Sequence, residues 1–411
     1  MEIITTGGEI MSGLTVDTNF SWAADRLAGA GLPVSYHTSV GDDVGEIVLA
    51  LRVAAARAQA VVVSGGLGPT ADDLGREAAA SFLGVGLVED AEARGWVEQY
   101  LRGRGRRVDR VHARLWSVPA GARALRNRRG SAPGFEVERE GVVYYFLPGV
   151  PSEFRDMVEA YVVPGLKQRF PTREAVLSML VKVTGLRESE VAEQIEGAPV
   201  EGVEVGFRAH FPEVHLRLTA HGATEGEARC RLERAVALVA ERLGESVFST
   251  DGRTLEEVVV GMLLERRLTI SVAESCTGGL LGHRITNVPG SSGCFERGVV
   301  SYSNEAKVEL LGVPAELIAA HGAVSAPVAE AMASGIRSVA GTDIGVGITG
   351  IAGPGGGTPA KPVGTVHIAL SHRRKGVFSR RFLFGGDRLQ IKTASTQAAL
   401  DMVRRFVLNG V

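Results

Sequence analysis

The stretch VVVSGGLGPTADD, residues 61 to 73, joins a β-branched apolar run to a glycine turn and two acids. An apolar run bounded by glycine and proline predicts a buried strand of a parallel sheet. Thr70 is expected to cap the helix that follows, with Asp72 and Asp73 in its first turn. Strand-like and helix-like runs alternate on both sides of this stretch. Residues 1–166 therefore predict an α/β domain.

Two further patterns follow along the chain. Between residues 170 and 248 a strand, a short helix, paired strands and a long helix predict a small α+β module. After the polar run at 249–253, the alternation of strands and helices resumes and predicts a second α/β domain over 252–411. The expected fold is two three-layer α/β domains with largely parallel sheets, joined by the small module.

The composition is that of a folded globular protein, with 45% hydrophobic and 22% charged residues. A formal net charge of -2 gives no global attraction to nucleic acid or to an anionic membrane. Three scattered cysteines form neither a disulfide framework nor a paired metal-binding spacing, which fits a reducing cytoplasm. No signal sequence or membrane-spanning run is recognisable, so we expect a cytoplasmic protein without membrane partners.

In the second α/β domain, AESCTGG at 273–279 lies where a strand is expected to pass into a helix. Ser275 would then stand beside free backbone N–H groups, as a nucleophile with nearby oxyanion donors would. The alternative is that Ser275 or Thr277 only caps the helix. We also expect Cys276, a second candidate nucleophile, to be a small buried residue.

Lys307 follows SYSNEA, residues 301–306, and is expected in the first turn of a helix. The helix dipole opposes a cation there and should lower the lysine pKa, which suits a base that activates serine. The alternative is a solvated lysine paired with Glu305 or Glu309.

A glycine-dense loop at 345–357 follows another expected strand, and its backbone amides around Gly353 and Gly355 suit a phosphate. It matches neither the dinucleotide fingerprint nor the phosphate-loop pattern. Arg388, at the start of the last helix, is a candidate for a bidentate contact to phosphate or carboxylate. The alternative is a helix cap at Asp387 followed by a surface arginine.

AESCTGG, SYSNEAK, GITGIAGPGGG and GDR occur in this order and resemble the carboxy-terminal domain of the CinA family, the nicotinamide mononucleotide deamidases. The resemblance implies hydrolysis of the carboxamide of nicotinamide mononucleotide to nicotinic acid mononucleotide and ammonia, without cofactor or metal. It implies that Ser275 is the nucleophile, Lys307 its base and Tyr302 a neighbour that orients them or relays the proton. Thr349 and Arg388 fall at substrate positions.

In the first domain, acids follow three expected strands: Glu9, the pair Asp42 and Asp43, and the pair Asp72 and Asp73. The carboxyl ends of parallel strands meet at one sheet edge, where such sheets bind ligands. Carboxylates beside a phosphate site usually hold a divalent cation, and the phosphate candidates are Gly66, Gly68 and Thr70. The alternative is that the acids only favour helix starts.

GGLGPTADD, VGDD, SAPGF and PGVPSEF resemble the amino-terminal domain of CinA proteins, which is related to the molybdopterin-binding fold. The resemblance implies a metal-dependent ADP-ribose pyrophosphatase that releases AMP and ribose 5-phosphate, with molybdopterin binding as the alternative. Family members commonly have Gly-Asp-Glu where this chain has Gly-Gly-Glu at 7–9, so an acid is missing at position 8.

The middle module resembles the KH-like linker domain of full-length CinA proteins. The GxxG loop that clamps a nucleotide backbone is absent at 184–188, so nucleic acid is not an expected partner. Residues 102–129 hold ten arginines and one acid, which predicts either an anion-binding patch or a solvated face. His215 and His221 are expected on strand and turn surfaces. The resemblance also implies a homodimer, and a non-catalytic role in DNA uptake or repair is the rival class.

Overall fold

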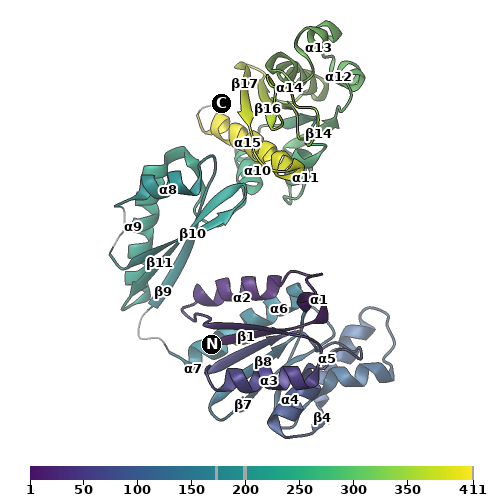
Figure 1. Ribbon diagram of the computed structural model, residues 1–411, viewed down its shortest axis with the longest axis vertical. Helices are drawn as coiled ribbons and strands as arrows, with labels where there is room; N and C mark the ends of the chain where they lie inside the picture. The colour runs from purple at the N-terminus through teal and green to yellow at the C-terminus, as the bar shows by residue number, and fades with distance from the viewer. Residues whose placement is uncertain (172–174, 198–200, 410–411) are drawn as a thin grey trace. The chain divides into compact units, whose positions relative to one another are not determined.

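The computed structural model describes residues 1–171, 175–197 and 201–409 (Figure 1). It divides into two compact units. The first comprises Met1–Leu177 and His221–Ala228, and the second comprises Ser178–Ala220 and Arg229–Val411. Each unit is described by itself below.

The first unit contains a six-stranded sheet in the order β2-β1-β3-β8-β7-β6. Its strands are β1 (Glu2–Thr6), β2 (Tyr36–Val40), β3 (Ala60–Ser64), β6 (Arg123–Leu125), β7 (Gly134–Arg139) and β8 (Val142–Leu147). The first four in this order are parallel, and β7 and β6 continue the sheet antiparallel. Strands β1, β3 and β8 are buried along their whole length because helices cover both faces of the sheet.

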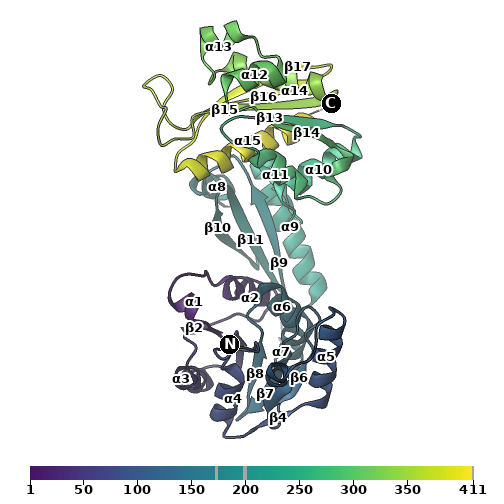
Figure 2. The same ribbon diagram turned by 90° about the vertical axis from the view of Figure 1, so that its right-hand side faces the viewer.

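Helices cover this sheet in two layers, with α2 and α6 on one face and α3 and α4 on the other (Figures 1 and 2). The helices are α1 (Gly8–Met11), α2 (Thr18–Ala28), α3 (Val44–Ala55), α4 (Gly75–Leu83), α5 (Ala91–Arg102), α6 (Pro151–Met157) and α7 (Val163–Arg169). A 3₁₀ segment at Arg110–Trp116 and a two-stranded sheet of β4 (Leu87–Glu89) and β5 (Ser117–Pro119) complete the unit.

The expected helix start at Thr70 is wrong. Helix α4 begins at Gly75, and its first flanking residue, Leu74, makes no side-chain cap. The glycine turn is therefore longer than the sequence indicated, because Asp73 satisfies Thr70 locally instead of entering a helix. As a result, Asp72 and Asp73 lie in the loop, beside the carboxyl edge of the sheet.

The middle module has the predicted order of elements, with a sheet arranged β10-β11-β9-β12. Its elements are β9 (Ala175–Val183), α8 (Glu188–Ile195), β10 (Val203–His210), β11 (Glu213–Gly222), α9 (Glu225–Leu243) and β12 (Val247–Ser249). The expectation that His215 lies on a surface is wrong. Its side chain is buried, stacks on His210 and contacts a Glu213 carboxylate oxygen at 2.8 Å.

The carboxy-terminal domain is built on a five-stranded sheet in the order β14-β13-β15-β16-β17. The strands are β13 (Ile270–Glu274), β14 (Phe295–Val300), β15 (Ile344–Gly350), β16 (Thr365–His372) and β17 (Gly376–Leu383). Strands β14, β13 and β15 are parallel, and β16 and β17 are antiparallel to their neighbours. The predicted fold class, α/β domains with largely parallel sheets and a KH-like module, is confirmed.

Helices again lie on both faces of this sheet, as Figure 2 shows. Helices α10, α11 and α15 pack on one face and α12, α13 and α14 on the other. Their bounds are α10 (Leu255–Glu265), α11 (Leu280–Thr286), α12 (Asn304–Leu311), α13 (Ala315–His321), α14 (Ala326–Ala340) and α15 (Arg388–Leu408). No helix in the described part of the chain is long and apolar enough to span a bilayer.

One strand boundary matters for the site. Strand β14 ends at Val300, opposite Glu274 of β13. Residues 301–303 therefore leave the sheet, and their carbonyl groups are free to bond a side chain.

Candidate active site

Ser275 begins the loop between β13 and α11, at the carboxyl edge of the sheet. Its backbone N–H donates to the Ile348 carbonyl at 3.0 Å, which fixes the residue beside β15. Gly278 and Gly279 have φ angles of 61° and 94°, and these left-handed conformations let the loop reverse tightly. The residue that flanks α11 is Gly279, so neither Ser275 nor Thr277 is the helix cap.

Lys307 lies in α12, the helix that follows β14, and its side chain contacts Ser275. The helix is capped by Ser303, whose Oγ accepts the Ala306 N–H at 3.0 Å. Lys307 is 1% exposed, and its Nζ donates to Ser275 Oγ at 3.2 Å. The same Nζ donates to the carbonyls of residues 301, 302 and 303 at 2.9, 3.2 and 3.3 Å. It is thus a buried partner of the serine and not a solvated surface lysine.

Burial shifts the pKa values of Lys307 and Cys276, the two ionisable groups beside Ser275, in opposite directions. Desolvation lowers the pKa of the Lys307 ammonium, against the opposing charges of Cys276 and Glu305. The sequence predicted the same direction from the helix dipole, but the physical cause here is burial. Desolvation raises the pKa of the Cys276 thiol to about 12. At neutral pH the cysteine is therefore a poor nucleophile, and the lysine is closer to acting as a base.

The pair opens into a cavity of about 280 Å³. Every predicted site residue of this domain lines it: Ser275, Tyr302, Lys307, Thr349, Gly353, Gly355 and Arg388. The Arg388 guanidinium donates to the Gly353 carbonyl at 2.6 Å and to the Tyr302 hydroxyl at 2.9 Å. Asp387 caps α15 as the alternative expected, while Arg388 still lies over the cavity.

Two details of this cavity were not predicted. The Tyr302 hydroxyl bonds Arg388, whereas it is the Tyr302 carbonyl that accepts from Lys307. Asn304, the first residue of α12, also lines the cavity. The sequence analysis included it in the SYSNEAK motif but did not predict it as a site residue. The Thr349 hydroxyl donates to the Ala323 carbonyl at 2.9 Å and so fixes the wall of the cavity.

Two backbone N–H groups next to the serine donate to no carbonyl oxygen within the described residues. They belong to Cys276 and Thr277, the two residues after Ser275. The residue that follows a nucleophile commonly supplies an oxyanion donor in hydrolases built on α/β sheets. The site thus combines a hydroxyl nucleophile, a buried amine and free N–H donors.

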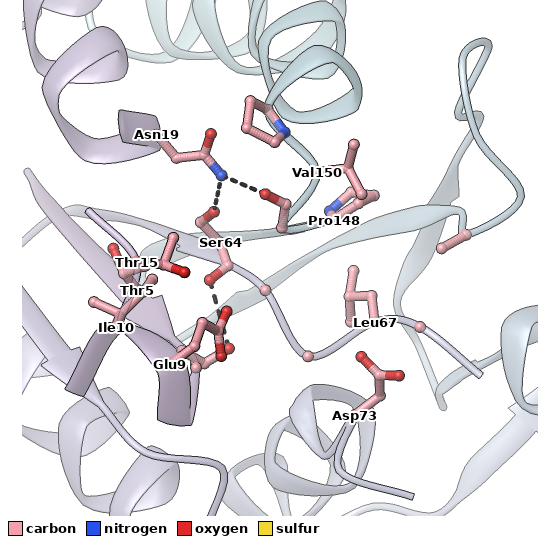
Figure 3. Close-up of a pocket in the computed structure, with 18 of the residues that line it drawn as sticks. Thr5, Glu9, Ile10, Thr15, Asn19, Ser64, Leu67, Asp73, Pro148 and Val150 are labelled. Atoms are coloured by element: carbon pink, nitrogen blue, oxygen red, sulfur yellow. Dashed lines mark hydrogen bonds between the residues drawn. The ribbon is translucent and has the colours of Figure 1, made fainter. Parts of the chain in front are cut away.

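A second cavity, of about 550 Å³, lies at the carboxyl edge of the first unit's sheet (Figure 3). The turns after β1, β3 and β8 meet there. Asn19 joins two of them, because its Nδ2 donates to Ser64 Oγ at 2.9 Å and to the Gly149 carbonyl at 2.7 Å. The predicted phosphate-binding positions Gly66, Gly68 and Thr70 line this cavity.

Four of the five predicted metal-binding acids also line it, namely Glu9, Asp42, Asp72 and Asp73. Asp43 does not: it caps α3, accepting the Glu46 N–H at 3.0 Å. Figure 3 shows Glu9 and Asp73 reaching the cavity from different elements.

The carboxylates mainly stabilise their own loops. Asp42 Oδ2 accepts the Gly8 N–H at 2.8 Å, at the position where the family's usual acid is missing. Asp73 Oδ2 accepts the N–H and the hydroxyl of Thr70 at 2.9 and 2.5 Å. Among the described residues, no group of three or more His, Cys, Asp or Glu is placed to hold a metal ion. The residues as placed do not fit the metal site that the resemblance implies.

Four of the ten arginines of residues 102–129 form ion pairs with acids of their own domain. Arg114 donates to the carbonyls of Thr70 and Asp73 and to Glu77, so it holds the glycine turn in place. Three further arginines pair with acids outside the segment: Arg102 with Glu98, Arg123 with Glu136, and Arg129 with Asp156. These contacts tie part of the segment to its own domain, and the choice between an anion-binding patch and a solvated face stays a prediction.

Fold and sites together define a three-domain protein: a molybdopterin-binding-like domain with a cavity at its sheet edge, a KH-like module, and an α/β domain with a buried Ser–Lys pair. Comparison with known families agrees. Residues 2–168 match the "Probable molybdopterin binding domain", residues 178–249 the "Damage-inducible protein CinA KH domain", and residues 252–407 the "CinA C-terminal domain". The chain belongs to the CinA family, as its motifs predicted.

Full-length relatives support this assignment. A protein of Moorella thermoacetica, named as a competence-damage inducible protein, is 46% identical over 98% of this chain and 98% of its own length. The CinA-like protein of Gemmatimonas aurantiaca is 42% identical over 98% of this chain and 96% of its own. Among solved structures, the competence/damage inducible protein CihA of Agrobacterium tumefaciens is 38% identical, covers 37% of this chain and 96% of its own, and has a TM-score of 0.36.

Proposed function

We propose that the carboxy-terminal domain is a serine amidase that hydrolyses the carboxamide of nicotinamide mononucleotide. The observation that carries this proposal is the buried Lys307 Nζ at 3.2 Å from Ser275 Oγ. A serine becomes a nucleophile at neutral pH when a positioned base removes its proton, and a lysine whose pKa is lowered by burial is suited to that task. The substrate itself is proposed from the family resemblance.

The chemistry follows from the groups in place. Neutral Lys307 takes the Ser275 proton while Oγ attacks the carboxamide carbon, and the carbonyls of residues 301–303 accept hydrogen bonds from the resulting ammonium. The N–H group of Cys276, a residue that lines the cavity, is the donor for the tetrahedral oxyanion. Collapse breaks the C–N bond, and Lys307 gives the proton to the departing NH₂ group, which leaves as ammonia. Water, deprotonated by the same amine, then cleaves the acyl-serine and releases the carboxylic acid.

Recognition of the nucleotide falls to the rim of the cavity. Arg388 carries two N–H donors that at present reach Gly353 and Tyr302, and a phosphate is a stronger acceptor for such a fork. The open backbone around Gly355, where an added Cβ would meet nothing within 4 Å, leaves room beside it. Phosphate binding there would place the other end of the substrate toward Ser275.

Ammonia release from nicotinamide mononucleotide by the purified full chain tests this function. We expect release without added metal and an unchanged rate in EDTA, because no step of the proposed mechanism uses a metal ion. Cys276→Ala is the matched variant: its thiol is buried with a pKa of about 12, so turnover should stay close to that of the wild type. Release that stops in EDTA, or in Cys276→Ala, contradicts the mechanism. No release at all favours the rival role in DNA uptake or repair, which salt-dependent DNA binding would then support.

For the amino-terminal domain we propose binding of ADP-ribose in the larger cavity, with its cleavage to AMP and ribose 5-phosphate as the activity that the resemblance implies. The supporting observation is a glycine turn in a cavity of about 550 Å³ at the carboxyl edge of a parallel sheet. Asp42 and Asp73 cap their own loops, and no group of three or more possible ligands is placed to hold a metal ion among the described residues, so we assign no step to a metal. Molybdopterin binding is the alternative, and a homodimer in solution belongs to the same family-based proposal.

Asp73→Ala tests the first-domain proposal. Asp73 holds Thr70 by two hydrogen bonds, so its loss should loosen the turn and weaken ADP-ribose binding by about tenfold, the equivalent of one good hydrogen bond. Asp43→Ala, which removes a cap outside the cavity, should bind normally. Calorimetric titration measures both, and AMP formation with and without Mg²⁺ measures cleavage. Equal affinity in the two variants, or pterin retained on purification, contradicts the assignment.

A further inference from the structure

Glu274 is the last residue of β13 and directly precedes Ser275. Its side chain is 1% exposed. A buried carboxylate is costly unless hydrogen bonds replace its lost water. This position in the chain therefore calls for a structural or functional reason.

Both carboxylate oxygens are held by the loop that carries the serine. Oε2 accepts the N–H groups of Gly279 and Leu281 at 3.0 and 3.1 Å, and Oε1 accepts the N–H of Gly282 at 2.8 Å. The backbone of Glu274 is itself anchored, since its carbonyl accepts the Ser301 N–H at 2.9 Å and it pairs with β15. The side chain thus ties the far end of the loop back to the strand from which the loop departs.

These bonds decide which backbone donors remain available. Three N–H groups between residues 275 and 282 go to Glu274, and three others go to carbonyls: Ser275 to Ile348, Gly278 to Ser275, and Leu280 to Thr277. The N–H groups of Cys276 and Thr277 donate to no carbonyl oxygen in the described structure. Without the carboxylate, three more unpaired N–H groups would compete for any anion near the serine.

We propose that Glu274 is a positioning residue of the serine site: it folds the loop so that Ser275 Oγ and the N–H group of Cys276, two residues that line the cavity, meet the same carbonyl group of a substrate. This inference rests on the proposed amidase function and names a residue that works through the loop, without touching substrate. The negative charge is not what catalysis uses, because a carboxylate near an oxyanion is unfavourable in itself. The geometry that it imposes is what matters.

Glu274→Gln tests the role with little change in shape. The amide keeps one acceptor oxygen but turns the other into an NH₂ group, which cannot accept a backbone N–H, so the loop must shift. Displacement of a reacting group by about 1 Å costs on the order of 100-fold in rate. We expect kcat for nicotinamide mononucleotide to fall about 100-fold, with KM nearly unchanged, because Arg388 and the glycine loop are not affected.

Asp343→Asn is the matched control for loss of a carboxylate near the same strand. Asp343 Oδ2 accepts the N–H and the hydroxyl of Thr269 at 3.0 and 2.9 Å, just before β13 begins and far along the strand from the serine. It should lower the melting temperature without changing kcat. A loss of kcat in Glu274→Gln that merely tracks its loss of stability, as measured against this control, overturns the positioning role.

A second readout separates this inference from the substrate proposal. A fluorophosphonate probe labels an activated serine whatever the natural substrate is, and its labelling rate should fall in Glu274→Gln as kcat does. If the wild-type protein is labelled but releases no ammonia, the proposed substrate is wrong, and the labelling rate of Glu274→Gln still tests the role of Glu274. Wild type that is not labelled overturns both. Glu274→Asp is measured in the same way, because its shorter side chain cannot reach the same N–H groups. This variant provides the test if Glu274→Gln does not fold. Normal labelling of Glu274→Asp overturns the positioning role.

Discussion

Ser275→Ala is expected to lower kcat for nicotinamide mononucleotide by a factor on the order of 10⁵ to 10⁶, the loss seen when the nucleophile of a serine hydrolase is removed. The hydroxyl is the group that the Lys307 amine reaches at 3.2 Å. Burial raises the pKa of the adjacent Cys276 thiol to about 12, so it is a poor nucleophile at neutral pH. Ammonia release under substrate saturation measures the loss. Labelling by a fluorophosphonate should disappear with it, while nucleotide affinity should persist because the rim of the cavity is unchanged.

Ser271→Ala, in the strand β13 that leads into Ser275, is the matched control. Its hydroxyl is also fully buried and shares a hydrogen bond of 2.8 Å with Thr342, so its removal should cost about 1 kcal/mol of stability and leave turnover intact. If Ser275→Ala keeps more than a trace of activity while Ser271→Ala behaves as expected, then another group attacks the amide. The double variant with Cys276→Ala would then show whether the thiol is that group.

The periodic elements of this chain could be read from its sequence because each has a strong local signal. The helix at Glu188–Ile195 and the strands on either side of Phe211 occur where the pattern placed them. Thr70 misled for a physical reason, since a threonine followed by two acids fits a helix cap and an isolated turn equally well. Only the closure of Asp73 onto Thr70 distinguishes the two, and that contact depends on the surrounding loops.

The serine and the lysine were found through motifs, but their contact depends on topology. Their connections leave β13 and β14, which are parallel neighbours, so both ends reach the same edge of the sheet. The early end of β14 then frees three carbonyls to surround the amine, a boundary that no periodicity revealed. Glu274 was missed, although an acid at the end of an apolar strand was a usable signal: a carboxylate forced into a core must find donors nearby.

The acids of the first domain show the limit of reading a site from residue type. Their convergence on one sheet edge was predicted from strand order, and four of the five line a single cavity. A carboxylate that caps a turn and one that binds a cation use the same oxygen atoms, however, and the sequence cannot distinguish them. Here backbone N–H groups bond three of the five acids: that of Gly8 bonds Asp42, that of Glu46 bonds Asp43, and that of Thr70 bonds Asp73.

Lys307→Ala is expected to lower kcat by about 10⁴-fold, at the upper end of what a general base contributes. Nucleotide affinity should be retained, because Arg388 and the glycine loop remain. The truncation leaves a cavity lined by the carbonyls of residues 301–303, into which a small primary amine can enter. Added ethylamine should restore part of the turnover in proportion to its unprotonated fraction. A structural role for the lysine would give no such dependence on pH.

Lys182→Ala is the matched control, because it also removes a buried lysine of the same unit. Lys182 lies in β9 and does not contact Ser275, so this variant should leave kcat unchanged. The pH dependence of kcat/KM in the wild type tests independently whether the neutral form of Lys307 is the active one. Burial disfavours the ammonium, so Lys307 loses its proton at a lower pH than an exposed lysine, and kcat/KM should rise with pH through that lowered pKa. Unchanged turnover in Lys307→Ala, or a profile that falls as the amine deprotonates, would remove Lys307 as the base, because only the neutral form can accept the proton of Ser275.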